Sequence, residues 1–256
     1  MGSRGGVHPV PLLLTLAGTA LVASGSMTLN MLLERDTDAL MHRTRGRPLP
    51  TGRLKPSEAL WFGLLLTSAG LLALALLVQP LAALVALATW ASYLFAYTPL
   101  KTRTSLSTVV GAVPGALPPV IGWAAARGSL EGGAFVLFAI LFLWQIPHFL
   151  AIAWIFREDY ARGGLPMLPV LDPAGHLTGR QAVANSLALT LVSLVPSVAG
   201  MTVRPYLYGA LALGVFFTGA AVVAAVKRTA ASARGLFLAS ILYLSSLLAL
   251  LLITRA

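Results

Sequence analysis

The chain has 256 residues, of which 57% are hydrophobic and only 10% are charged, and its mean hydropathy is +0.84. Soluble globular domains carry about 25% charged and about 45–50% apolar residues, so this composition excludes that class and indicates a membrane protein. The formal net charge of +10 does not indicate a nucleic-acid binder, because the Lys and Arg residues lie in short gaps between long apolar runs. Cysteine is absent, which excludes disulfides, thiolate metal sites, cysteine nucleophiles and covalent c-type heme attachment.

Eight apolar segments follow one another, each long enough, or nearly so, to cross a hydrocarbon core of about 30 Å. Backbone groups in lipid must be paired within the chain, so these segments should be α-helices. We therefore predict an all-α fold, a polytopic transmembrane bundle of about eight spans that forms one domain over residues 1–256. The segments are 9–33, 58–78, 81–97, 107–126, 132–155, 182–203, 206–226 and 235–253.

The charged residues alternate between the two sides of the predicted bundle. The loops after the first, third, fifth and seventh segments hold 14 of the 18 Lys and Arg residues. By the positive-inside rule that side is cytoplasmic and both termini lie outside. We expect the membrane to be the cell membrane (inner or plasma membrane). Seven of the eight acidic residues lie on the same side. Topology does not require acids, so their position suggests chemistry at the cytoplasmic face.

The N-terminus has a second interpretation, a signal peptide. Arg4, the apolar run 10–23 and the small residues that follow it resemble one. Cleavage there would place the most basic loop outside the cell, against the charge rule, and the apolar run resumes through residues 27–33. A first transmembrane helix is therefore the preferred interpretation.

The loop after the first segment opens with a polar stripe. Asn30, Glu34 and Asp38 are spaced by four residues, so on one continuous helix they lie above one another over about 12 Å. Asp36 points to another face. Two carboxylates at one membrane boundary repel each other unless a cation joins them, and Mg²⁺ binds one or two carboxylates with substrate phosphates completing its shell.

A basic run follows this stripe and complements it. The guanidinium of Arg bonds two phosphate oxygens at once, so acids that hold a metal followed by cations suit a metal–diphosphate complex. The alternative is an ordinary basic loop in which acids balance charge. Asn30 at the apolar boundary favours the functional interpretation, because polar groups there are costly. The run consists of Arg43, Arg45, Arg47, Arg53 and Lys55.

The fifth segment ends in a second acidic cluster at the same face, Glu158 and Asp159 beside Arg157. If its helix is continuous, His148 and Asp159 lie near one stripe, with Trp144 one turn deeper, although a proline at position 147 loosens that register. Neutral imidazole is a metal ligand, so His148 is a candidate for contact with a polar substrate or heme iron. The alternative role is a hydrogen bond to a neighbouring helix, and the same doubt applies to His42.

The third charged loop contributes Lys101 and Arg103, which are placed to reach a diphosphate, although topology alone also explains two cations there. The aromatic rings of Tyr97 and Trp144 can attract a nearby cation to their faces.

Five motifs together resemble the UbiA-type intramembrane prenyltransferases, and in detail their protoheme IX farnesyltransferase (heme O synthase) branch. The resemblance covers nearly the whole chain. The motifs are Asn30-x3-Glu34-Arg35-Asp36-x-Asp38-x2-Met41-x-Arg43-Thr44-x2-Arg47-Pro48-Leu49, Tyr97-x3-Lys101, Pro118-Pro119-Val-Ile-Gly-Trp, Trp144-Gln-x-Pro-His148 and Asp159-Tyr160-x3-Gly164-x-Pro166-Met-Leu-Pro169-Val.

The resemblance implies a reaction, a metal and partners. Farnesyl diphosphate and protoheme IX give heme O and diphosphate, with Mg²⁺ as cofactor, in a lipid bilayer and upstream of heme A synthase or heme–copper oxidase assembly. It implies metal–diphosphate binding by Asn30, Glu34, Asp38 and Asp159, and neutralisation of the leaving group by Arg43, Arg47, Lys101 and Arg157.

Two departures from the family pattern matter. Glu34 stands where the family usually has Asp, which lengthens the ligand. The chain also begins before what would be the family's second helix, so eight spans are expected where the family has nine. The alternative functions are prenylation of an aromatic quinone precursor and secondary transport. Transporter sites lie near the bilayer midplane, whereas these acids gather at one interface.

Overall fold

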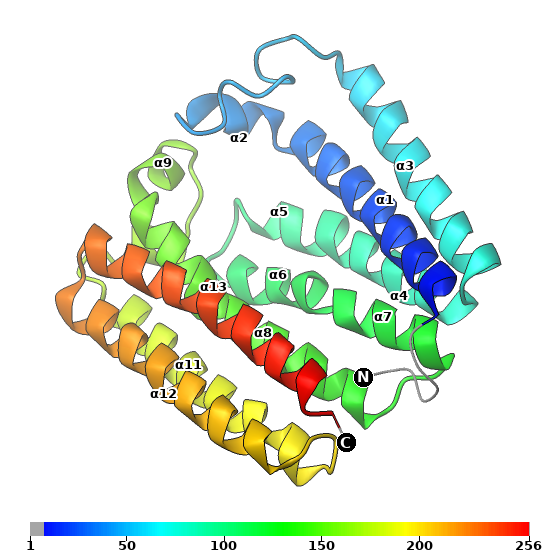
Figure 1. The fold of residues 1–256 in the computed structure, drawn as a ribbon. Coiled ribbons are helices and arrows are strands. Elements are labelled where there is room, and N and C mark those ends of the chain that lie inside the picture. The colour runs from blue at the N-terminus through cyan, green and yellow to red at the C-terminus, as the bar shows by residue number, and fades with distance from the viewer. Residues whose placement is uncertain (1–7, 256) are drawn as a thin grey trace. The chain divides into compact units, whose positions relative to one another are not determined.

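The computed structural model describes residues 8–255, so Arg4 of the signal-peptide alternative lies outside the described residues. Within that range the chain is helical and contains no β-strand beyond one isolated bridge between Thr202 and Arg255. Eight helical stretches are long and apolar enough to cross a membrane, which confirms the predicted all-α bundle of spans (Figure 1). The elements are α1 (Pro9–Leu33), α2 (Arg35–Leu40), α3 (Pro56–Leu77), α4 (Pro80–Ala91), a π-helical segment η1 (Ser92–Tyr97), α5 (Thr98–Leu100), α6 (Ser107–Ala116), α7 (Pro118–Arg127), α8 (Gly132–Ile155), α9 (Arg157–Arg162), α10 (Leu168–Leu171), α11 (His176–Val198), α12 (Arg204–Lys227) and α13 (Ala230–Ile253).

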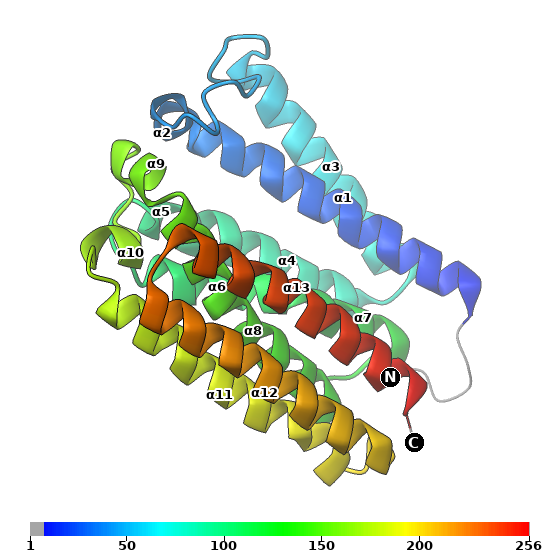
Figure 2. The ribbon, with the colours of Figure 1, turned by 60° about the vertical axis from the view of Figure 1, so that its left-hand side comes forward.

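The chain divides into two compact units. The N-terminal unit contains residues 8–130 together with 158–166, and the C-terminal unit contains 131–157 and 167–255. In the first, α1 packs on α3, and α4 packs on both α3 and α7. In the second, α11, α12 and α13 pack in succession, and α8 lies against α11 and α13 (Figure 2). The short helix α9, apart from its first residue Arg157, therefore belongs to the N-terminal unit.

Helices α1 and α3 approach closely through glycines spaced by seven residues on each. A Cβ atom at Gly70 would lie 2.6 Å from the carbonyl oxygen of Gly18, and one at Gly25 would lie 2.7 Å from the carbonyl oxygen of Gly63. In lipid, water does not drive helices together, so close backbone packing at small residues supplies the attraction. This contact holds the helix that carries the polar stripe.

We expect Gly70→Val to lower the unfolding midpoint in detergent, because its methyl groups would collide with the backbone of α1, at a cost of about 1–3 kcal/mol. The matched control is Gly122→Val on α7, where a Cβ meets nothing within 4 Å. Equal midpoints for the two variants would contradict this account of the packing.

The sixth span begins and ends earlier than predicted, at His176 and Val198 rather than at 182 and 203. Asp172 explains the early start, since its carboxylate accepts hydrogen bonds from the backbone N–H of His176 (3.2 Å) and of Thr178 (2.8 Å). Burial by itself would raise the pKa of Asp172, but these hydrogen bonds and the Thr178 hydroxyl lower it below the ordinary value of 3.8. The first turn of α11 therefore depends on an ionised Asp172.

Asp172→Ala should lower the free energy of unfolding by about 1 kcal/mol at pH 7, as for loss of other helix caps. Because the folded pKa lies below the unfolded one, the carboxylate stabilises the fold above the unfolded pKa and loses that effect as the pH falls through the folded pKa. The gap between wild type and variant in denaturant titrations should therefore close below pH 3.8. A gap that persists there would contradict the role of the charge.

Candidate active site at the end of the first span

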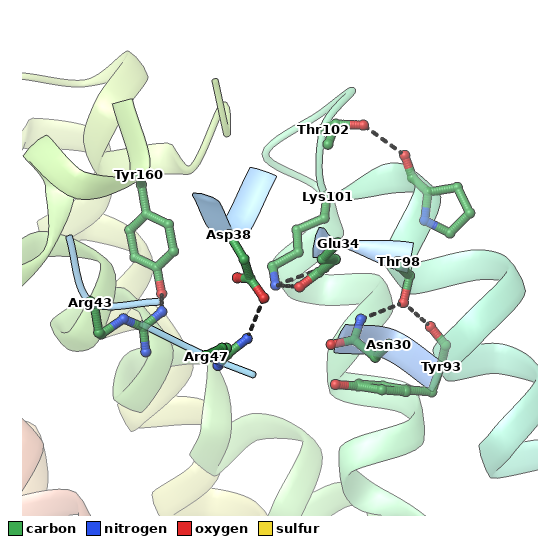
Figure 3. A network of polar contacts seen from close by, with 11 residues as sticks. Asn30, Glu34, Asp38, Arg43, Arg47, Tyr93, Thr98, Lys101, Thr102 and Tyr160 are labelled. Carbon is green, nitrogen blue, oxygen red and sulfur yellow. Dashed lines mark hydrogen bonds and ion pairs between the residues drawn. The ribbon is translucent and has the colours of Figure 1, made fainter. Parts of the chain in front are cut away.

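The polar stripe survives a break in its helix. Helix α1 ends at Leu33 and α2 starts at Arg35, with Glu34 between them at φ −95° and ψ 6°. The N–H of Glu34 still donates to the Asn30 carbonyl (2.9 Å), and the N–H of Asp38 donates to the Glu34 carbonyl (2.7 Å). The four-residue spacing is thus preserved, and Figure 3 shows these three side chains near Lys101 and Arg47.

Asp38 is the most buried charged residue of the stripe, with no exposed surface. Its Oδ2 accepts a 2.7 Å hydrogen bond from the guanidinium of Arg47. Its Oδ1 is buried and has no hydrogen-bond partner. A carboxylate oxygen left unpaired inside a protein is costly, which makes this atom a candidate ligand for a cation.

Glu34 is paired with Lys101, which comes from the loop after α5. The Lys101 Nζ donates to both carboxylate oxygens at 2.9 Å and lies 5.5 Å from the centre of the Tyr97 ring. Burial alone would lower the pKa of Lys101, but the negative charges of Tyr97, when ionised, and of Glu34 raise it above its ordinary value. Lys101 is therefore a permanent cation at this site.

Asn30 is oriented by Thr98, a residue that sequence reasoning missed. The hydroxyl of Thr98 donates to the Tyr93 carbonyl (2.8 Å), so it can only accept from the Asn30 amide nitrogen (3.0 Å). The Asn30 side-chain oxygen is left without a partner and is accessible, since it is not among the buried unpaired atoms. The wide π-helical turn of η1 precedes Thr98, and such turns are frequent at functional sites.

Asp159 holds the loop that follows α2. Its carboxylate accepts hydrogen bonds from the backbone N–H groups of His42 and Arg43, both at 3.0 Å, and from the guanidinium of Arg162 at 3.0 Å. These contacts join segments 117 residues apart. Asp159 thus fixes the basic loop here, and its role as a metal ligand stays a prediction.

Tyr160 also contacts the loop that follows α2, and sequence reasoning missed it as a site residue. Its hydroxyl accepts a 3.4 Å hydrogen bond from the Arg43 guanidinium, which lies 5.7 Å from the ring centre and is drawn beside it in Figure 3. Its sequence signals were its position directly after an acidic cluster and its place in the fifth family motif.

The side chains of several predicted residues take no part in these contacts within residues 8–255. Asp36 is exposed and pairs with its neighbour Arg35, as expected from its different helix face. The side chains of Glu158, Arg103 and His42 are exposed. In the C-terminal unit, the Arg157 guanidinium lies 4.9 Å from the centre of the Trp154 ring. Their predicted roles stay predictions.

The expected shared stripe of His148 and Asp159 is wrong. Helix α8 ends at Ile155, and Phe156 at φ −108° and ψ 23° interrupts the helix before α9 begins. The proline at position 147 does not cause this break, because α8 continues through it. His148 instead contacts Trp144 and Ser240 within the C-terminal unit.

The donor set suits a hard divalent cation, although within residues 8–255 no three His, Cys, Asp or Glu side chains gather at one point. Two oxygens without partners, Asp38 Oδ1 and the Asn30 side-chain oxygen, come from the same stripe. Mg²⁺ prefers such oxygens and fills its remaining positions with water and substrate phosphates. Two protein oxygens therefore fit Mg²⁺ bound with a diphosphate.

Asp159→Ala should release the loop after α2, because two backbone donors lose a charged acceptor, an interaction of about 1.5–3 kcal/mol. Amide hydrogen exchange at His42 and Arg43 should accelerate at least about tenfold. Glu158→Ala, the exposed neighbouring acid, is the matched control and should leave both rates unchanged. Unaltered rates in Asp159→Ala would remove the positioning role.

Comparison with known proteins relates this chain to one family. A model described as the UbiA prenyltransferase family matches residues 1–248. Among relatives, a protoheme IX farnesyltransferase of Solibacter usitatus is 54% identical over 95% of this chain and 84% of its own, and one of Sorangium cellulosum is 46% identical over 98% and 89%.

Solved structures agree on the fold. A digeranylgeranylglyceryl phosphate synthase structure has a TM-score of 0.80 at 16% identity and covers 99% of this chain and 88% of its own. A UbiA homolog of Archaeoglobus fulgidus bound to DMAPP and Mg²⁺ has a TM-score of 0.71 at 16% identity, over 98% and 91%. The chain belongs to the UbiA prenyltransferase family.

Proposed function

We propose that this protein transfers the farnesyl group of farnesyl diphosphate to a vinyl group of protoheme IX and so makes heme O. The C–O bond to diphosphate breaks, a C–C bond to the vinyl carbon forms, and water supplies the new hydroxyl group, with diphosphate released. The names and the 54% and 46% identities of the two relatives support this reaction. We also propose that residues 1–256 form a single prenyltransferase domain, as the sequence predicts.

The observation that carries the proposal is the buried Asp38 carboxylate with one oxygen free. We assign Asp38 Oδ1 and the Asn30 side-chain oxygen as ligands of a Mg²⁺ ion. Glu34 would be a third ligand if Lys101, which now binds its carboxylate, paired with a diphosphate instead. When bound, the ion stabilises charge on the leaving diphosphate. Magnesium in the solved relatives bound to DMAPP and GPP supports this assignment, and Glu158 and Asp159 remain further candidates.

Cations of the chain neutralise the departing diphosphate. Lys101 and Arg47 each already bind a carboxylate of the stripe, so diphosphate would exchange one anionic partner for another without leaving a buried cation unpaired. Arg43 is held by Asp159 through its backbone and by Tyr160 through its side chain. Preplaced charge of this kind is the largest single contribution to stabilising a developing anion. Arg103 and Arg157 are the remaining candidates.

The allylic cation needs protection from water until the vinyl carbon attacks it. Tyr97 lies beside Lys101, and its ring contacts Tyr93 at 5.4 Å between centroids. An aromatic face there contributes about 0.5–2 kcal/mol of cation–π stabilisation. A Cβ at Gly111 would lie 2.6 Å from the Tyr97 ring. The absence of a side chain at Gly111 therefore makes room for that ring.

We place the site at the cytoplasmic face of the cell membrane, since the charged loops that carry it are those selected by the positive-inside rule. The expected downstream partners are proteins that modify heme O or insert it, such as heme A synthase or the heme–copper oxidase assembly proteins. Prenylation of a quinone precursor is the competing activity, and the mass of the product distinguishes the two.

The test is formation of heme O by the purified protein in liposomes with farnesyl diphosphate, protoheme and Mg²⁺, followed by mass spectrometry. Chelation of the metal should abolish it. Asp38→Asn should reduce the rate by about 10²–10³-fold, since it removes a charge that acts on the transition state. Asp36→Asn, at an exposed carboxylate in the same helix, should retain the wild-type rate. Full activity in Asp38→Asn would overturn the metal site, and prenylation of a quinone precursor without heme O would overturn the proposed substrate.

A further inference from the structure

His148 and Ser240 form a hydrogen-bond relay between α8 and α13. The Ser240 hydroxyl donates to the carbonyl of Phe237 at 2.5 Å, which uses its one proton. Its contact with Nδ1 of His148, at 2.7 Å, must therefore be a bond that the imidazole donates. Ser240 has no exposed surface, so water does not compete for this bond.

The relay determines which nitrogen of His148 carries the lone pair. With the proton on Nδ1, Nε2 of the neutral ring is unprotonated. Within the described residues Nε2 makes no hydrogen bond, and it is not among the buried atoms without a partner. An accessible basic nitrogen thus lies inside an apolar span, where unused polar groups are costly and usually functional.

Aromatic side chains fix the plane of this imidazole. The Trp144 ring stacks on it with centroids 4.8 Å apart and planes at 24°, and the Phe237 ring lies 5.0 Å away. Trp144 is itself held, because its Nε1–H donates to the carbonyl of Ser240 at 2.7 Å. One buried residue on α13 therefore positions both members of the Trp–His pair.

A purely structural role accounts for only half of this arrangement. A hydrogen bond that ties α8 to α13 explains Nδ1 and Ser240. It does not explain an imidazole whose second nitrogen is accessible and whose tautomer and plane are both set. Metal-binding histidines show this pattern, in which one ring nitrogen donates a hydrogen bond that orients the ring and the other binds the metal.

We propose that Nε2 of His148 is an axial ligand of the protoheme iron, and that Ser240 is the positioning residue that presents it. This inference rests on the proposed function, since it concerns the acceptor substrate of that reaction. The apolar and aromatic surroundings suit the face of a porphyrin, and the ligand would hold the macrocycle in one orientation.

The experiment is a titration of the purified protein in detergent with hemin and, separately, with metal-free protoporphyrin IX, which has no axial position. Wild type should bind hemin at least about tenfold more tightly, and its ferrous complex should show an iron–histidine stretch in resonance Raman spectra. His148→Ala should lose both the preference and the stretch, and added imidazole should restore an axial ligand. His176→Ala, at an exposed histidine that contacts Arg228, is the matched control and should resemble wild type.

Ser240→Ala separates positioning from ligation. It should keep an iron–histidine stretch at a shifted frequency with weaker hemin binding, because the ring keeps its ligand atom but loses its anchor. A wild-type stretch and preference in His148→Ala would overturn the proposal. If that variant still makes heme O at the wild-type rate, the ligand assignment fails while the proposed function stands. Absence of heme O with the wild-type protein would instead count against the function.

Discussion

A carboxylate removed from solvent at the edge of a lipid-spanning helix requires compensation, and the site is organised around that constraint. Asp38 has no exposed surface and a single guanidinium partner, Arg47. Glu34 is similarly matched by Lys101. Removing one partner of such a pair leaves an uncompensated charge that costs several kcal/mol. The magnesium–diphosphate that we propose as the ligand carries both signs of charge, so it would be able to replace both ion pairs without leaving a buried charge unpaired.

The second acidic cluster serves the same loop by another means. Asp159 gives its oxygens to backbone amides of the segment after α2 and to Arg162. Gly163 lies directly against the same segment, since a Cβ there would lie 3.0 Å from the Met41 side chain. The basic loop is thus attached from outside its own helix, so its cations are held in place before substrate binds. Such preorganisation is what electrostatic catalysis requires.

Orientation by hydroxyl groups occurs in both structural units. Thr98 gives its proton to a carbonyl and accepts from Asn30, which turns the amide oxygen outward. Ser240 gives its proton to a carbonyl and accepts from His148, which leaves Nε2 free. In each case a hydroxyl whose proton is already used has only acceptor capacity left, so it selects one orientation or tautomer of its neighbour.

Composition and periodicity alone predicted the fold class, the number of spans and the polar stripe. Apolar length and backbone pairing in lipid allow few alternatives, and the i, i+4 spacing of Asn30, Glu34 and Asp38 persists through the kink at Glu34. The motifs also identified the family. What tertiary structure decided is which oxygens are paired and which are free, and that Asp159 binds backbone rather than extending a stripe from His148. Those outcomes depend on contacts between residues as many as 117 positions apart and on a π-helical turn before Thr98, which local spacing does not encode.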